Sequence, residues 1–583
     1  MASFSRLVPF SSSTTALQAI TYLLGVSLFS ISFLVFLNSS VSFVITDLIG
    51  QKRGVGDVVG TLGFADEIVA LVACPAWGLV SDRLGVRWVA VMGYAIIGVA
   101  LMVFVQAKNI YPQLLLARVF FAVGASAAAT MVTAVLPSLT DENDERNLGS
   151  PSRPKPNTHH PRDSIAYSVE SELTITPQSY TRDASNERVP RAGDHESAQT
   201  FGKAPALAGY VGLATGCGAL VALVLFLPLP TRFGEIDEVT PGQAVSYSFY
   251  VVGAVSLLVS IFVAFGLRGL KGEDGKGWRV LLGLKSRDEL EGYMDTDNHG
   301  GARSQQKVIP YLHLLQDSVL LGLTDSRIAL GYLGGFVARA STVAISLFIP
   351  LFINTFFISN GYCQGSPNDP NPELKKECRS AYVLSSILTG VAQLLALMCA
   401  PLFGYLSNRP GRVNWPIVIS TVFGIVGYII FPQLSSPEIK DEDGRGGTPA
   451  VFLVVALIGI SQIGAIVCSL GSLGRGVLAV ELPRSVRPPS IAPDEDESTE
   501  AEPLIRIATQ EDSVSRIRLK GSIAGVYSLC GGFAILLLTK LGGYLFDKVS
   551  TGAPFYMMAV FNGILLVTTL LMDASQTFAT NRH

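Results

Sequence analysis

The chain has 583 residues, of which 49% are hydrophobic and 15% are charged, and its mean hydropathy is +0.42. This composition excludes an ordinary water-soluble globular protein, in which about a quarter of the residues are charged. The net charge of -3, without basic stretches interleaved with aromatic residues, argues against nucleic-acid binding. We therefore expect an integral membrane protein.

Twelve hydrophobic stretches are long enough to cross a bilayer, for which a helix needs about 20 residues. Because backbone polar groups must be paired inside the membrane, we interpret all twelve as helices. Six precede and six follow a charged segment. The predicted spans are 20–46, 57–80, 88–106, 112–138, 204–229, 245–268, 329–357, 381–406, 414–432, 450–471, 521–546 and 553–572.

A short pattern occurs twice, each time at the end of a long hydrophobic run. The first copy begins at Gly78 and reads GLVSDRLGVR, and the second begins at Gly404 and reads GYLSNRPGR. Glycine, serine and arginine recur at identical spacing. Internal duplication of this kind is common in transporters, so the sequence predicts two copies of one membrane unit.

The short loops determine the predicted orientation, because basic residues favour the cytoplasmic side. Both copies of the pattern place arginines between spans, so these loops and both termini are predicted to be cytoplasmic. One insertion contains few large hydrophobic residues and is predicted to be disordered. The predicted organisation is a tail at 1–19, a first bundle at 20–269 with this disordered cytoplasmic insertion at 140–203, a cytoplasmic linker at 270–327, a second bundle at 328–572 with a cytoplasmic insertion at 472–520, and a cytoplasmic tail at 573–583.

The first copy of the pattern resembles the signature loop of the major facilitator superfamily, and the chain is similar to fungal-type, proton-coupled members. The resemblance implies an all-α integral membrane fold, with twelve transmembrane helices as two pseudo-symmetric six-helix bundles around a central cavity. In that family the cavity opens alternately to each side of the membrane. The implied function is secondary active transport of a small solute, such as an organic anion, a drug or a metabolite.

The resemblance assigns a conformational latch to the two loops. Gly78 permits close helix approach, and Asp82 can bind the N-terminus of a neighbouring helix. Arg83 and Arg87 can pair across the interface between the halves. Because the second copy has an amide in place of the acid, we expect the first latch to be stronger. The alternative is an ordinary basic turn. The predicted latch residues are Gly78, Asp82, Arg83, Gly85, Arg87, Gly404, Asn408, Arg409, Gly411 and Arg412.

Charged residues within the predicted spans are candidates for coupling. The segment around Arg118 resembles the arginine-bearing motif of proton-driven members of the superfamily. Asp66 and Glu67 lie at a similar depth in the second span, so we predict that one of them pairs with Arg118. Such a pair could exchange a proton during transport, and the alternative is a static ion pair that closes the outer end.

Arg339 lies near the middle of the seventh span and is the strongest candidate for substrate contact. Two inward arginines, one in each half, favour an anionic or carboxylate-bearing substrate. The alternative is that Arg339 pairs with a backbone carbonyl or with Gln393 or Gln462.

Glycines in the fifth and eleventh spans predict surfaces for close helix packing or hinge motion. The run in the fifth span faintly resembles the glycine-rich motif of drug exporters, which favours efflux over import. The predicted packing residues are Gly212, Gly216, Gly218, Gly525, Gly531 and Gly532.

Two further candidates lie outside the spans. Cys363 and Cys378 share one non-cytoplasmic loop and are predicted to form a disulfide, the alternative being two thiols that never meet. Glu500, Leu504 and Ile505 fit an acidic dileucine signal that adaptor proteins read. The predicted location is therefore a vacuolar membrane or the plasma membrane.

The sequence contains no phosphate-cradling loop, zinc-binding helix motif or nucleophile elbow. We therefore predict no enzyme, no cofactor and no resident metal. The expected partners are a small-molecule substrate, the lipid bilayer, protons and adaptor proteins. The alternatives are a sensor or scaffold that acts through its insertions, a channel, and a transporter of copper or another metal ion.

Overall fold

The computed structural model is helical throughout its regular secondary structure. Twelve helices in the described part of the chain are long and hydrophobic enough to cross a membrane, as the sequence predicted. Their residues belong to one compact unit. The structure describes residues 9–11, 13–51, 55–140, 203–236, 239–273, 276–281, 311–360, 379–408, 414–439, 446–478 and 519–580.

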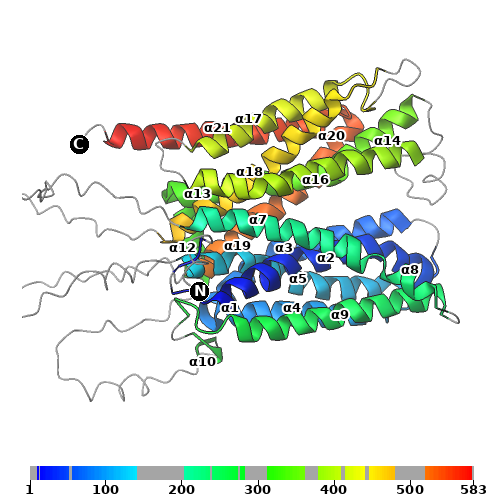
Figure 1. Cartoon of the computed structure of the whole chain (residues 1–583), viewed down its shortest axis with the longest axis horizontal. Coiled ribbons are helices and arrows are strands. Elements are labelled where there is room, and N and C mark those ends of the chain that lie inside the picture. The colour runs from blue at the N-terminus through cyan, green and yellow to red at the C-terminus, as the bar shows by residue number, and fades with distance from the viewer. Residues whose placement is uncertain are drawn as a thin grey trace, which may run out of the picture. The chain divides into compact units, whose positions relative to one another are not determined.

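The helices form two halves of six spans each (Figure 1). Several spans contain a π-helical turn and therefore carry two labels. The first half consists of α1 (Ala16–Ile20) with α2 (Leu28–Phe43), α3 (Val55–Leu84), α4 (Val86–Phe104), α5 (Leu115–Thr140), α7 (Ala204–Val221) with α8 (Leu229–Gly234), and α9 (Pro241–Gly266). The second half consists of α13 (Ser326–Val343) with α14 (Ile349–Ser359), α16 (Arg379–Ser407), α17 (Trp415–Ile430), α18 (Ala450–Leu478), α19 (Lys520–Leu537) with α20 (Gly543–Lys548), and α21 (Ala553–Thr580).

The structure extends several predicted elements. The first span covers Ala16–Leu48, and the last helix continues to Thr580. The predicted linker contains two further helices, α10 (Trp278–Leu281) and α12 (Tyr311–Thr324). Hydropathy marks the stretch that crosses the hydrocarbon core, but a helix continues beyond it wherever its backbone remains hydrogen-bonded, so helix ends are poorly predicted.

Several predictions concern residues outside the described part of the chain. Most of the two insertions and part of the linker fall there. The same applies to the candidate residues Arg409, Gly411, Arg412, Cys363, Cys378, Glu500, Leu504 and Ile505.

The two ends of the bundle differ. We call the end that carries the loop after α3 the motif end, and the end that carries α8, α14 and α20 the open end (Figure 1). The buried core of the first half continues into the second at the motif end, where Leu136, Leu473 and Ile523 belong to one cluster. A separate cluster containing Phe352 and Phe555 fills the second half toward the open end. The halves are therefore packed together at the motif end.

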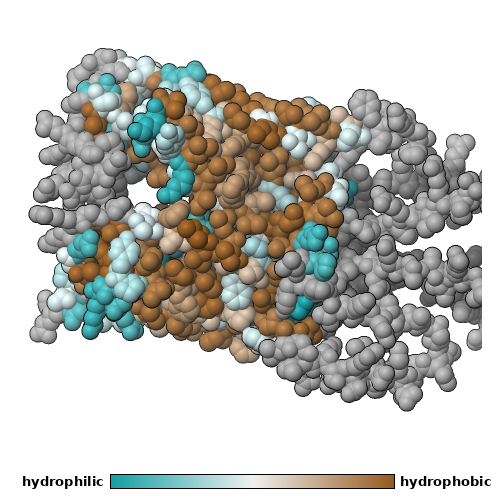
Figure 2. Space-filling model, turned by 180° about the vertical axis from the view of Figure 1, so that it is seen from behind, coloured by the Kyte–Doolittle hydropathy of each residue, from teal (hydrophilic) through white to brown (hydrophobic). Residues whose placement is uncertain are grey.

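Most of the described surface is hydrophobic on the face seen in Figure 2, and hydrophilic residues gather toward the helix ends. This distribution is the one that a lipid environment requires. A hollow separates the two groups of helices toward the open end in the same view.

Candidate functional site

The first copy of the repeated pattern lies where α3 of the first half meets α19 of the second. A Cβ atom at Gly78 would lie 2.5 Å from the carbonyl oxygen of Gly521 and 3.0 Å from the Cα atom of Gly525. Any side chain at Gly78 would therefore force the two helices apart. The glycines allow backbone contact between the halves at the motif end.

Asp82 extends this contact with hydrogen bonds across the interface. Its carboxylate accepts the backbone N–H groups of Gly521 and Ser522 at 2.8 and 2.7 Å, and it also accepts the hydroxyl of Ser522. These N–H groups belong to the first turn of α19, where no carbonyl within the helix can accept them. The positive end of the helix dipole attracts the same carboxylate.

A buried lysine that we did not single out in the sequence joins this interface. Lys520 is 1% exposed, and its Nζ atom lies 2.7 Å from Glu273 Oε1 and 2.5 Å from Ser138 Oγ. Glu273 Oε2 accepts the backbone N–H of Val86 at 2.7 Å. Glu273 therefore connects the loop after α9, the start of α4 and the start of α19. The prediction placed Lys520 in an insertion, whereas it is the first residue of α19.

Arg87 does not pair across the interface, so this prediction was wrong. Its Nε atom donates to the carbonyl oxygen of Ala264 at 2.8 Å, and its guanidinium lies 4.9 Å from the ring centre of Trp88. Ala264 belongs to the last turn of α9, where carbonyl groups lack helical partners and attract cations. Arg87 therefore binds within the first half. The backbone carbonyl of Arg83 accepts the N–H of Gly277 at 3.0 Å, and the Cβ space of Gly85 is occupied by Glu273.

The second copy of the pattern joins α16 to α7. A Cβ atom at Gly404 would lie 2.8 Å from the Cα atom of Gly209 and 3.1 Å from the carbonyl oxygen of Pro205. The side-chain oxygen of Asn408 is buried and has no hydrogen-bond partner among the described residues. This copy therefore provides close packing without the carboxylate contacts of the first.

A charged cluster lies within the spans of the first half. Arg118 is 3% exposed, and its Nε atom donates to the two carboxylate oxygens of Asp66 at 2.9 and 2.7 Å. A second guanidinium nitrogen contacts Asp66 and donates to the side-chain oxygen of Asn38. The structure thus brings together Arg118 and one of its two candidate carboxylates. Asn38, from α2, was not among the predicted residues.

Glu67 and Arg339 come from opposite halves. Arg339 is the residue whose positive charge acts on Glu67 from the second half. Neither side chain forms a hydrogen bond or an ion pair with another described residue. A Cβ atom at Gly531 would lie 2.7 Å from Cγ of Arg339, so this predicted packing glycine makes room for the arginine. Asp66, Glu67, Arg118 and Arg339 together form the charged cluster, and their formal charges sum to zero.

The two candidate glutamines do not bind Arg339, which corrects that alternative. Gln462 Nε2 donates to Thr342 Oγ1 at 2.9 Å, while its buried oxygen has no partner among the described residues. Gln393 lines a cavity on α16. Gln462 therefore bonds to Thr342 and Gln393 lies in the cavity wall, and neither is hydrogen-bonded to Arg339.

The remaining predicted glycines lie at close helix contacts. A Cβ atom at Gly218 would lie 2.0 Å from the carbonyl oxygen of Leu28, and one at Gly216 would lie 2.5 Å from Leu397 Cδ1. Gly212 would meet Ile463 and Gly532 would meet Leu71, at 3.3 and 3.4 Å. Their contacts are with neighbouring helices rather than with the charged cluster.

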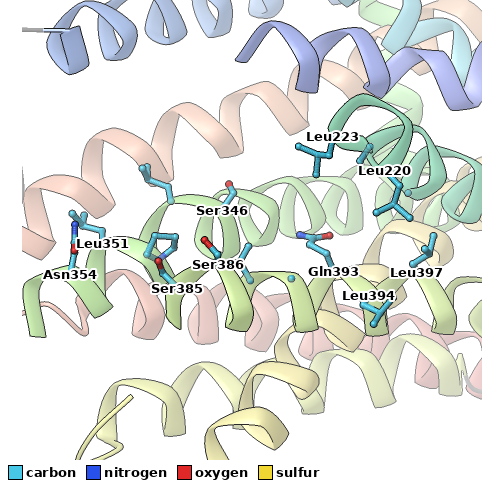
Figure 3. Close-up of a pocket in the computed structure, with 16 residues that line it drawn as sticks. Leu220, Leu223, Ser346, Leu351, Asn354, Ser385, Ser386, Gln393, Leu394 and Leu397 are labelled. Atoms are coloured by element: carbon cyan, nitrogen blue, oxygen red, sulfur yellow. The ribbon is translucent and has the colours of Figure 1, made fainter. Parts of the chain in front are cut away.

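A cavity of about 840 Å³ lies between the halves toward the open end (Figure 3). One wall comes from α7 and its π-helical continuation, and the other comes from α14, α16 and the turn before α14. A volume of this size accommodates a drug-sized molecule. Within the described ranges, no group of three or more His, Cys, Asp or Glu side chains is arranged to hold a metal ion.

Comparison with known proteins adds a family and a fold. The sequence profile of the Major Facilitator Superfamily matches residues 28–150 and 200–478. Among curated protein sequences, no significant match is found.

Three solved structures match nearly the whole length of this chain. The proton:xylose symporter XylE bound to 6-bromo-6-deoxy-D-glucose is 11% identical, with a TM-score of 0.50 over 96% of this chain and 95% of that chain. A double-tryptophan mutant of XylE is 10% identical, with a TM-score of 0.51 over 95% of each chain. The E. coli fucose:proton symporter FucP is 10% identical, with a TM-score of 0.48 over 95% of this chain and 98% of that chain.

Proposed function

The chain belongs to the major facilitator superfamily, and from that premise we propose that it is a proton-coupled secondary transporter of an organic anion. In this proposal the two halves rock about the motif end and expose the charged cluster alternately to each side of the membrane. The predicted topology places the motif end in the cytoplasm, together with the tails, the linker and the insertions. The structure then corresponds to an outward-facing state.

The observation that carries the proposal is the unequal pairing of the four intramembrane charges. Arg118 is bonded to Asp66, whereas Glu67 and Arg339, from opposite halves, interact only through their charges and form no hydrogen bond with described residues. Ionisable groups within a membrane are costly and therefore point to function. We assign Asp66 and Arg118 to a static pair, and Glu67 and Arg339 to the transport step.

This assignment explains how a proton and an anion would move together. When Glu67 is ionised, it offers Arg339 a negative partner, and an incoming carboxylate must compete with it. When Glu67 takes a proton, that competition ends and Arg339 can bind the anion. The loaded cluster has the same net charge as the empty one, because one proton and one monovalent anion enter together.

The test is transport by the full-length protein in liposomes that contain a trapped pH dye, with a panel of organic carboxylates. We expect proton uptake with at least one anion. Glu67→Gln should abolish proton movement but retain anion exchange, because the neutral side chain mimics the protonated state. Arg339→Ala should lose both activities, and Leu402→Ala, at an exposed site on α16, should keep both.

Two outcomes would contradict the proposal. Undiminished proton movement in Glu67→Gln would remove Glu67 from the coupling step. Absence of flux across the panel would favour the sensor alternative. The predicted efflux direction rests on the glycines of the fifth span. The same liposomes test it, because substrate added on one side of the membrane evokes proton movement only if the protein accepts substrate from that side.

We also propose a fungal-type origin for the chain and a membrane in which it resides. The dileucine-like segment supports a vacuolar membrane reached through adaptor proteins, and the alternative is the plasma membrane. Leu504→Ala with Ile505→Ala should then shift a fluorescently tagged full-length protein to the plasma membrane. An unchanged distribution would remove this segment from sorting.

A further inference from the structure

The cavity between the halves begins where a regular helix contact ends. From the motif end, Gly209 of α7 meets Gly404 of α16, and one turn on Gly212 meets Ala400. A further turn on, Gly216 meets Leu397. Beyond Gly216, toward the open end, α7 and α16 separate and line the cavity. The cavity therefore begins where the close contact between these two helices ends.

The two walls of the cavity have different chemistry. The α7 wall is entirely hydrophobic and presents Leu220 and Leu223, whereas α16 presents polar side chains, Ser386 and Gln393 among them, beside Leu394 and Leu397. Figure 3 shows Leu220 and Leu223 on one side of the space and Ser386 and Gln393 on the other. All sixteen lining residues are uncharged, so the cavity differs from the charged cluster.

The polar wall has unused hydrogen-bonding capacity. The hydroxyl oxygen of Thr389 is buried and has no partner among the described residues. The side chains of Ser386 and Gln393 form no hydrogen bond with a described residue. By contrast, Ser346 donates to the carbonyl oxygen of Thr342 at 2.8 Å. Ser386 and Gln393, both exposed on α16, are therefore available to a bound molecule.

Closure of the open end would bury the polar side chains of α16 against the leucines of α7. Continuing the spacing of the existing contacts would bring Leu220 against Gln393 and Leu223 against Thr389 or Gly390. Leucine offers no hydrogen bond, and each buried polar group without a partner costs about 1–3 kcal/mol. An empty cavity therefore opposes closure, whereas a molecule with one polar and one hydrocarbon face would remove the penalty.

We infer that this cavity binds the uncharged, amphipathic part of the transported solute. Its hydroxyl or carbonyl groups contact the polar wall, and its hydrocarbon face contacts the leucines. The inference rests on the proposed transport function and specifies the substrate class. Ser346 lies two helical turns, about 10 Å, along the same span from Arg339, a distance that one drug-sized molecule can cover.

The test measures binding without any gradient or flux. The full-length protein in nanodiscs is labelled with azi-octanol, a photoactivatable neutral alcohol, and the labelled peptides are mapped by mass spectrometry. We expect saturable labelling of segments 219–223 and 385–397. Competition by 1,2-octanediol should be at least tenfold stronger than competition by octyltrimethylammonium, because the lining carries no charge.

Variants test the two walls separately. Gln393→Leu should weaken the apparent affinity about fivefold through the loss of one hydrogen bond, and Leu223→Ser should weaken it by a similar factor. Leu402→Ala, on the exposed face of α16, is the matched control and should bind as the unmodified protein does. Labelling that does not saturate, or that is equal in all variants, would overturn the inference.

A lipid could supply the same chemistry, so a second arm uses a photoactivatable diacylglycerol in the nanodisc. Saturable labelling of the cavity by the diacylglycerol, with none by azi-octanol, would identify a lipid site and overturn solute recognition. Binding and flux can fail independently. Anion-coupled proton uptake without cavity labelling would leave the transport proposal intact, and cavity labelling without flux would leave the cavity assignment intact.

Discussion

The two copies of the loop pattern make similar glycine contacts and different polar contacts. Gly78 meets Gly521 and Gly525 of α19, and Gly404 meets Pro205 and Gly209 of α7. The partners are four residues apart in both cases, so Pro205 occupies the place of Gly521. Steric closure is therefore common to both copies.

The polar contacts diverge at the same places. Asp82 accepts the N–H groups of Gly521 and Ser522, whereas Asn408 stands in the place of the acid and Pro205 in the place of the first donor. Proline has no N–H group to donate. The acid and its donor are thus lost together in the second copy. The charge-dependent contacts of the motif end therefore lie where the start of α19 meets the first half, at Asp82 and at Glu273.

The largest effect is expected from Asp82→Ala. The variant loses three hydrogen bonds to a charged acceptor, each worth about 1.5–3 kcal/mol, and leaves donors of α19 without partners. We expect the equilibrium to move by at least a hundredfold toward the state closed at the open end. Spin labels at Tyr111 and Val549, both exposed at the open end, would report a shorter distance in double electron–electron resonance.

Asp82→Asn provides the control for folding, because it keeps acceptor atoms while removing the charge. It should fall between the unmodified protein and the alanine variant. An unchanged spin-label distance in both variants would show that the carboxylate contacts do not set the equilibrium.

A smaller effect is expected from Lys520→Met. Removing one member of a buried ion pair costs about 3–5 kcal/mol, but the loss is partly recovered here because Glu273 retains the N–H of Val86 and Lys276. We expect a tenfold to hundredfold shift in the same spin-label experiment. Glu273→Gln in the Lys520→Met background should restore part of the population that is closed at the motif end, since no unpaired carboxylate remains. Additive effects of the two substitutions would contradict a direct pair.

The second copy of the pattern can be given the acid and the donor that it lacks. Asn408→Asp alone should weaken motif-end closure, because the added charge is buried opposite a proline. Combined with Pro205→Gly, which supplies an N–H group, it should restore the population that is closed at the motif end. That population should then exceed the original one by up to about fivefold, which corresponds to roughly one hydrogen bond. Equal spin-label distances for the single and double variants would show that the missing donor does not explain the asymmetry.

Much of the fold followed from the sequence because membrane spans are long and chemically uniform. The duplicated loop predicted two related halves, and depth along the spans predicted a partner for Arg118. The choice between Asp66 and Glu67 did not follow, since adjacent helical residues point about 100° apart and the sequence does not specify how α3 is rotated against α5. This rotation places one carboxylate against Arg118 and leaves the other without a hydrogen bond, within the electrostatic influence of Arg339.

The sequence provides little indication of two other features, the contact of Lys520 with Glu273 and the polar wall of the cavity. Glu273 and Lys520 lie at the edges of polar segments, where charged residues are usually solvated, and the path of a loop is not encoded in hydropathy. The polar wall of the cavity consists of isolated serine, threonine and glutamine residues within a span, and such residues often bond to their own helix. Their common orientation toward α7 emerges from packing between the halves.

The smallest effect is expected from Arg87→Gln. Arg87 binds the carbonyl of Ala264 within the first half, so both ends of this contact move together when the halves rock. Its loss should lower the thermal stability of the protein while changing the population that is closed at the motif end by less than threefold. A shift as large as that of Asp82→Ala would mean that Arg87 contributes to the contact between the halves, and the charge-dependent contacts would then extend beyond those that the start of α19 makes.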